Sequence, residues 1–115
     1  MMDRSVDLRL SDMIEAIERI RSVVSRLSLD EFETNWEYQW LVERGVLIIS
    51  EASRYLSTEL KARHPEIPWA KVAGIGSVLR HDYERIASDV IWKLTTIDLP
   101  ILDAVCRDEL AKNST

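Results

Sequence analysis

The chain contains little cysteine, proline or glycine. Its 115 residues include one cysteine, Cys106, three prolines and three glycines. A single cysteine excludes a disulfide bond within the chain and is typical of a reducing compartment, so we expect a cytoplasmic protein. An all-β domain needs many turns, and this scarcity of turn-forming residues favours long helices with few connections.

Long apolar runs and excess positive charge are also missing. No apolar run approaches the roughly 18 residues of a membrane-spanning helix, and no apolar segment follows a basic one near the start, so we expect neither membrane insertion nor a signal peptide. The net charge of −5 argues against a protein that coats nucleic acid through bulk electrostatics. Hydrophobic residues at 46% and charged residues at 30% are typical of a folded chain, which we interpret as one domain over residues 1–115.

Hydrophobic side chains recur at helical spacing in four parts of the chain, so we predict four helices. Their expected bounds are Asp7–Leu27, Asn35 to about Arg63, Trp69 to Tyr83 or Arg85, and Ser88 or Asp89 to about Leu110. Residues 28–35 form a loop or a possible extra short helix, capped by Ser28 or Asp30. The pattern predicts an all-α, up-and-down four-helix bundle.

Prolines mark the breaks in the second half of the chain. Pro65 and Pro68 disfavour helix in the residues before them, and Pro68 suits the first turn of the third helix. Pro100 removes one backbone hydrogen bond inside the fourth helix, so we expect a kink or break near Asp98. The expected core stripe of the fourth helix is Val90, Leu94, Ile97, Ile101 and Val105.

The second predicted helix is apolar on two faces. The first face, at about 100° per residue, comprises Leu41, Gly45, Ile48, Ile49, Ala52, Leu56 and Leu60. The second comprises Trp36, Trp40 and Leu47, with Glu51 beside them. Since one face suffices for the chain's own core, the other predicts contact with another helix or another subunit.

The third predicted helix has a bulky face and a small face. The bulky face, expected in the core, comprises Ile75, Val78, Leu79 and Tyr83, and the small face comprises Gly74, Ser77 and His81. Glycine inside a helix costs about 1 kcal/mol relative to alanine, so we expect another element to approach closely here. A second subunit on the small face would place His81 at a subunit interface.

The residues alone leave simpler interpretations open for the ionisable group at the end of this helix. His81 can cap carbonyls or lie in solvent, and Arg80 can pair with Glu84 on the surface. Tyr83 can be a core-edge residue with its hydroxyl at the rim.

Two stretches carry a family resemblance. "IPWAKVAGIGSVLRHDY" and "DVIWKLTTIDLPIL" resemble the signature region of HepT-like toxins in the HEPN superfamily, and "IISEASRYL" resembles the glutamate-containing segment of the family's second helix. The resemblance runs from Ile48 to Leu102. It implies an all-α homodimer with the active site in the cleft between subunits. It also implies a metal-independent endoribonuclease without a cofactor, acting on RNA and paired with a minimal nucleotidyltransferase antitoxin.

The family signature is arginine, four residues, histidine, one residue, tyrosine. By position, the histidine is His81, a candidate acid or base, and the tyrosine is Tyr83, which the antitoxin can modify with AMP. The arginine position holds Gly76, and the asparagine that usually follows is Ser77. Glycine cannot replace a guanidinium as a phosphate clamp. Arg80, one turn further along, is the candidate substitute.

Other residues have supporting interpretations. Glu51 either orients His81 across the interface or solvates the rim around Trp36 and Trp40. A local basic patch is expected from Lys61, Arg63, His64, Lys71 and Arg85.

Three functions compete at this point. The first is an RNA-cleaving toxin in which a dimer buries Trp36, Trp40 or Leu47 together with Gly74. The second is a catalytically impaired dimer that binds a nucleotidyltransferase, which the glycine at the arginine position favours. The third is an unrelated bundle, which the resemblance disfavours.

Overall fold

The computed structural model describes residues 4–81 and 88–113, and all its regular elements there are helical. The long helices are α1 (Arg4–Val24), α3 (Trp36–Ser53), α5 (Trp69–His81) and α7 (Leu99–Asn113). The short elements are α2 (Leu29–Thr34), α4 (Thr58–Ala62), α6 (Ser88–Lys93) and the π-helical turn η2 (Leu94–Asp98). The all-α prediction is therefore confirmed.

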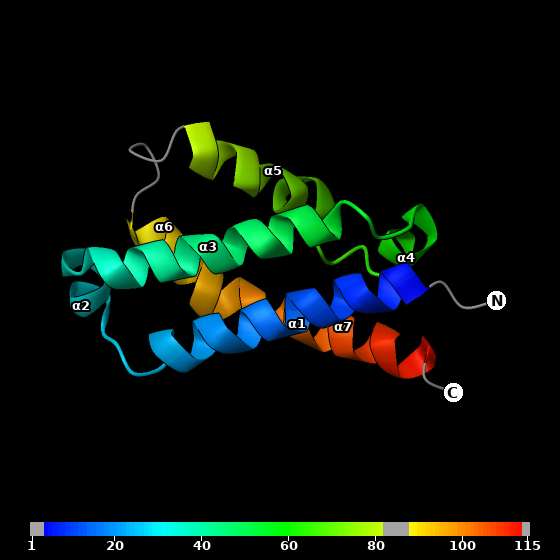
Figure 1. Ribbon diagram of the computed structural model, residues 1–115, viewed down its shortest axis with the longest axis horizontal. Helices are drawn as coiled ribbons and strands as arrows, with labels where there is room; N and C mark the ends of the chain where they lie inside the picture. Colours follow the sequence, from blue (N-terminus) through cyan, green and yellow to red (C-terminus); the bar gives the residue numbers. More distant parts are fainter. Residues whose placement is uncertain (1–3, 82–87, 114–115) are drawn as a thin grey trace.

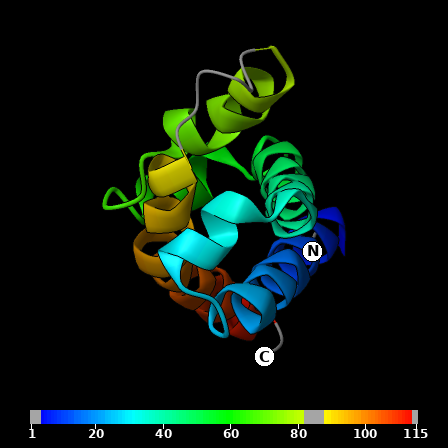
Figure 2. The ribbon, with the colours of Figure 1, turned by 90° about the vertical axis from the view of Figure 1, so that its left-hand side faces the viewer.

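The helices form an elongated bundle of 48 × 28 × 22 Å (Figure 1). Helix α1 packs against both α3 and α7, whereas α5 packs chiefly on α3. Figure 2 shows the bundle from its end, with α5 at one extreme and α7 near the other. Because α5 lies at the margin, its position depends on its contact with α3. In the part of the chain that is described, no helix is both long and apolar enough to cross a membrane.

The core is built where α1 meets α3 and α7. Its fully buried side chains include Leu10, Met13, Ile17, Ile20, Val42 and Cys106. Gly45 brings α3 close to α1, because a Cβ atom there would lie 2.6 Å from the side chain of Ile20. Burial raises the pKa of the Cys106 thiol to about 12, so this cysteine is a core residue and not a reactive thiol.

The predicted second helix is interrupted, which corrects its expected end near Arg63. Helix α3 ends at Ser53, and the next amides turn back onto carbonyls three residues earlier, as in Tyr55 to Ala52 at 3.1 Å. The Ser57 hydroxyl then caps α4 by accepting from the Leu60 amide at 3.1 Å. This cap competes with a continuous helix, and the resulting corner buries Leu56 and Leu60 together.

Other predicted helix boundaries are close to those observed. Ser28 caps α2 in a reciprocal pair with Glu31, as one of the two expected caps. Asn35 caps α3, its side-chain oxygen accepting from the Glu37 amide at 3.0 Å. The irregularity predicted near Asp98 takes the form of a π-helical turn without a break, in which the Leu99 amide donates to the Leu94 carbonyl oxygen. The widened turn accommodates the missing amide of Pro100.

The predicted core stripe of the fourth helix is mostly wrong. Val90, Ile97 and Ile101 are about half exposed, whereas Val105 is buried and Leu94 is partly buried, as predicted. The other buried apolar side chains of this region belong to Ile91, Leu99, Leu102 and Cys106. The π-helical turn adds a residue to one turn and so changes which side chains face inward. Val78 of α5 and Leu41 of α3, both expected in the core, are also exposed.

A buried charged group joins α4 to α7. The Glu109 side chain is 1% exposed and accepts two hydrogen bonds from Arg63, at 2.7 and 3.2 Å. The Nε2 atom of His64 lies 2.6 Å from the same carboxylate. The hydrogen bonds from Arg63 are the largest cause that holds the pKa of Glu109 at about 2, against an ordinary 4.5. Glu109 is therefore ionised in the folded chain.

We predict that this carboxylate makes folding pH-dependent. Because its pKa is lower in the folded state, its stabilisation is present above about pH 4.5 and lost as the pH falls towards about 2. A pKa shift of this size corresponds to about 3 kcal/mol in the free energy of unfolding. In thermal unfolding at pH 7, the melting temperature of Glu109→Gln should be well below that of the unsubstituted protein. The difference in melting temperature should become smaller in acid. Asp108→Asn, which alters an exposed carboxylate 3.2 Å from Lys112, is the control. A gap that does not change with pH would contradict this assignment.

Candidate active site

The start of α5 is fixed by Trp69. Its indole nitrogen donates to the carbonyl oxygens of Lys61 at 3.1 Å and His64 at 3.0 Å. These bonds tie the first turn of α5 to the end of α4. The prolines of residues 64–68 end the preceding helix, as predicted.

The middle of α5 is joined to α3 through the hydroxyl of Ser50. Ser50 Oγ donates to the Ala73 carbonyl oxygen at 2.8 Å and accepts from the Gly76 amide at 3.2 Å. A Cβ atom at residue 76 would lie 2.7 Å from this Oγ and 3.1 Å from the Ser50 Cβ. Gly76 is therefore the residue that lets α5 approach α3.

A guanidinium lies at the same contact. Arg54, the residue that follows α3, donates from Nη2 to the Ala73 carbonyl oxygen at 3.2 Å. Sequence reasoning missed both Ser50 and Arg54, because the helical periodicity of the sequence does not show which side of α3 contacts α5. The pairing of a serine with a helical glycine was the available signal.

The open side of α5 is at Gly74. A Cβ atom there would meet no atom within 4 Å in the described part of the chain. Ser77 is half-buried. The backbones of Arg80 and His81 belong to the last turn of α5, but their side chains lie outside the described part of the structure, and Tyr83 lies outside the described residues. The structure thus fixes the helix that carries the signature histidine.

The predicted interface residues of α3 do not share one surface. Trp36 and Trp40 are 60% and 62% exposed, with ring centroids 5.0 Å apart. Leu47 is half-buried, and a Cβ atom at residue 76 would lie 3.5 Å from it, so it packs towards α5. Glu51 accepts from the Tyr55 hydroxyl at 3.5 Å and is about 16 Å along α3 from Trp40. Its carboxylate therefore does not border the tryptophan pair.

Of the expected basic patch, Lys61, Arg63, His64 and Lys71 lie in or between α4 and the first turn of α5, and Arg85 lies outside the described residues. Arg63 and His64 contact Glu109 at the start of α5, about 18 Å along the helix from its last residue. The ligand atoms of His64, Asp108 and Glu109 lie within 4.8 Å of one another, close enough to hold a metal ion. However, Arg63 and Lys112 already neutralise these carboxylates, so the arrangement favours an ion-pair network.

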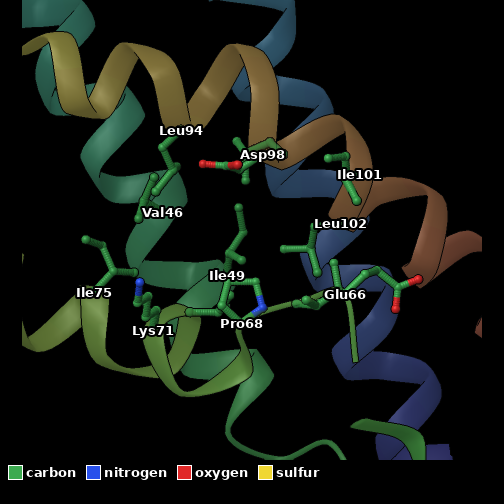
Figure 3. A pocket seen from close by; sticks show the side chains of 13 residues that line it. Val46, Ile49, Glu66, Pro68, Lys71, Ile75, Leu94, Asp98, Ile101 and Leu102 are labelled. Atoms are coloured by element: carbon green, nitrogen blue, oxygen red, sulfur yellow. The ribbon is translucent and has the colours of Figure 1, made fainter. Parts of the chain in front are cut away.

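A separate apolar pocket of about 400 Å³ lies between α5 and the η2–α7 segment (Figure 3). Val46, Ile49, Ile75 and Leu102 form part of its wall, and Lys71, Glu66 and Asp98 contribute its charged groups. The pocket exists because α5 packs on α3 and diverges from α7. It contains no residue of the family signature.

Comparisons with known proteins show the family of the chain. A protein family described as "Ribonuclease HepT-like" matches residues 13–108. A protein of Thermococcus cleftensis named "Probable ribonuclease HepT" is 36% identical over 101 residues, which cover 88% of this chain and 92% of the relative. "Putative RNase MJ1380" of Methanocaldococcus jannaschii is 30% identical over 100 residues, covering 87% and 92%. No solved structure gives a significant match.

We predict that the contact between Ser50 and Gly76 contributes measurably to stability. Gly76→Ala places a methyl group against Ser50 and should lower the free energy of unfolding by about 1–2 kcal/mol, despite the better helix propensity of alanine. The same substitution in a Ser50→Ala background should cost less, because the Oγ atom at 2.7 Å is gone. Urea unfolding of the four proteins measures this difference. Equal costs in both backgrounds would mean that Ser50 is not the obstacle.

Proposed function

Because the chain belongs to the ribonuclease HepT-like family, we propose that it is an endoribonuclease whose active site forms around His81 where two copies of α5 meet. The family match includes all of α5, and the sequence retains the signature histidine and tyrosine. The observation that carries this proposal is the position of His81 on a helix whose adjacent small face, at Gly74, is open.

Two imidazoles in a dimer cleft can share the chemistry of RNA cleavage. One copy of His81 takes the proton from the 2′-hydroxyl as it attacks phosphorus, and the other gives a proton to the leaving 5′-oxygen. Histidine suits both tasks near neutral pH, because its reference pKa is about 6.5. This chemistry needs no metal ion, so the proposed nuclease is metal-independent.

The developing charge on the phosphorane needs a cation, and the position of the signature arginine cannot supply one. Residue 76 is a buried glycine packed on Ser50. Arg80, one residue before His81 on α5, is the proposed substitute.

A binding function without cleavage is the second candidate. Gly76, which stands where the signature has arginine, favours this function. It is packed against α3, so an arginine at residue 76 would displace α3 or α5. In this version the helical dimer is the binding subunit of a nucleotidyltransferase antitoxin, and Tyr83 is the residue that receives AMP. The added negative charge and bulk would block a phosphate-binding cleft. Both versions place the protein in a cytoplasmic toxin–antitoxin pair.

We predict RNA cleavage in the presence of a chelator. His81→Ala should abolish it, and Arg80→Ala should reduce it strongly, as followed on a labelled RNA by gel electrophoresis. The other histidine of the chain supplies the control, since His64→Asn alters the Glu109 network at the far end of α5. Cleavage that survives His81→Ala would rule out the mechanism. A folded dimer that never cleaves RNA would favour the binding function.

We also predict a homodimer that uses the small face of α5. Gly74→Trp should separate the subunits while circular dichroism shows unchanged helix, since the added side chain enters open space within one chain. Light scattering over a concentration series measures the assembly. The same substitution at the exposed Ala104 of α7 is the control. A protein that is monomeric before any substitution would refute the dimer.

A further inference from the structure

The Arg54 guanidinium lies between α3 and α5, next to the position at which the family signature has its arginine. Its Nη2 atom and the Ser50 Oγ contact the same Ala73 carbonyl oxygen, at 3.2 and 2.8 Å. Ser50 Oγ also accepts from the Gly76 amide at 3.2 Å. One hydroxyl therefore separates the anchor of this guanidinium from the backbone of residue 76.

The Arg54 guanidinium has unused donor capacity. Arginine has five N–H donors in a planar fork that fits a phosphate, and the contact with Ala73 uses one of them. Arg54 is exposed, and no carboxylate among the described side chains pairs with it. Glu51, one turn earlier on α3, is contacted by the Tyr55 hydroxyl. A guanidinium held by a backbone carbonyl, with its other donors towards solvent, is suited to bind an anion.

We propose that Arg54 is an RNA-binding residue that holds a backbone phosphate beside the one that is cleaved. This inference rests on the proposed ribonuclease function, because it needs RNA as the ligand. Ala73 and His81 are eight residues apart on α5, about 12 Å along the helix axis. This separation of the backbone positions favours two different phosphates for the two residues. Arg54 therefore acts in substrate binding, whereas Arg80 is proposed to stabilise the charge on the reacting phosphate.

The salt dependence of RNA binding tests this role directly. Each phosphate contact on a single strand contributes about −0.7 to the slope of log affinity against log salt. Binding of a fluorescent single-stranded RNA is measured by anisotropy between about 50 and 200 mM salt, in a His81→Ala background that prevents cleavage. Arg54→Gln and Arg54→Met should each make the slope less negative by about 0.7 and weaken binding about fivefold. Arg54→Lys should leave the slope unchanged.

Arg26→Gln is the matched control. Arg26 is also exposed, and its Nε donates to a helical carbonyl, that of Ser22, at 2.9 Å, so the substitution removes the same charge and the same kind of bond. It should leave the slope unchanged. An unchanged slope in both neutral Arg54 variants, or an equal decrease in Arg26→Gln, would overturn the assignment.

The cleavage assay separates this inference from the proposed function. With His81 intact, Arg54→Gln should raise KM about fivefold and leave kcat within about twofold. His81-dependent cleavage with an unchanged KM would overturn the role of Arg54 and leave the ribonuclease standing. RNA binding that depends on Arg54, without any cleavage, would support this contact and reject the nuclease.

Discussion

The approach of α5 to α3 at Ser50 and Gly76 is the constraint on which the candidate site depends. Helix α5 lies at the margin of the bundle and packs chiefly on α3, where Leu79 is buried and Val72 and Ile75 are partly buried against the core. Trp69 fixes its first turn, and the Ser50 hydroxyl bonds to both Ala73 and Gly76 in the middle. These contacts determine where the backbone of His81 is presented.

The same contact explains why the signature arginine cannot be restored by a simple substitution. Residue 76 faces α3, and even a methyl group there meets Ser50 at 2.7 Å. A long charged side chain at this position would have to leave the interface or force the helices apart, and burying an unpaired guanidinium is costly. Cations for an anionic substrate must therefore come from neighbouring positions, where the side chain can reach solvent. The exposed Arg54 meets that condition.

Much of the fold could be predicted from the sequence, because local chemistry sets most helix ends. Asn35 and Ser28 cap helices, and Pro100 perturbs the fourth helix where expected. The break before Ser57 was missed, because the apolar pattern of the sequence continues in phase from α3 into α4. The inward face of the last helix was missed because a π-helical turn breaks the regular period. The candidate site could be predicted only as far as the helix that carries it, since Ser50 and Arg54 act through long-range contacts.

Apolar surface lies outward in two parts of the molecule. The pocket between α5 and the η2–α7 segment includes Ile101, which is about half exposed. Trp36 and Trp40 lie on the other half of α3, away from any core. Clustered exposed apolar side chains such as this tryptophan pair are a feature of surfaces that bind partners. The open face of α5 at Gly74 and the exposed tryptophan pair are the surfaces that the proposed association would bury.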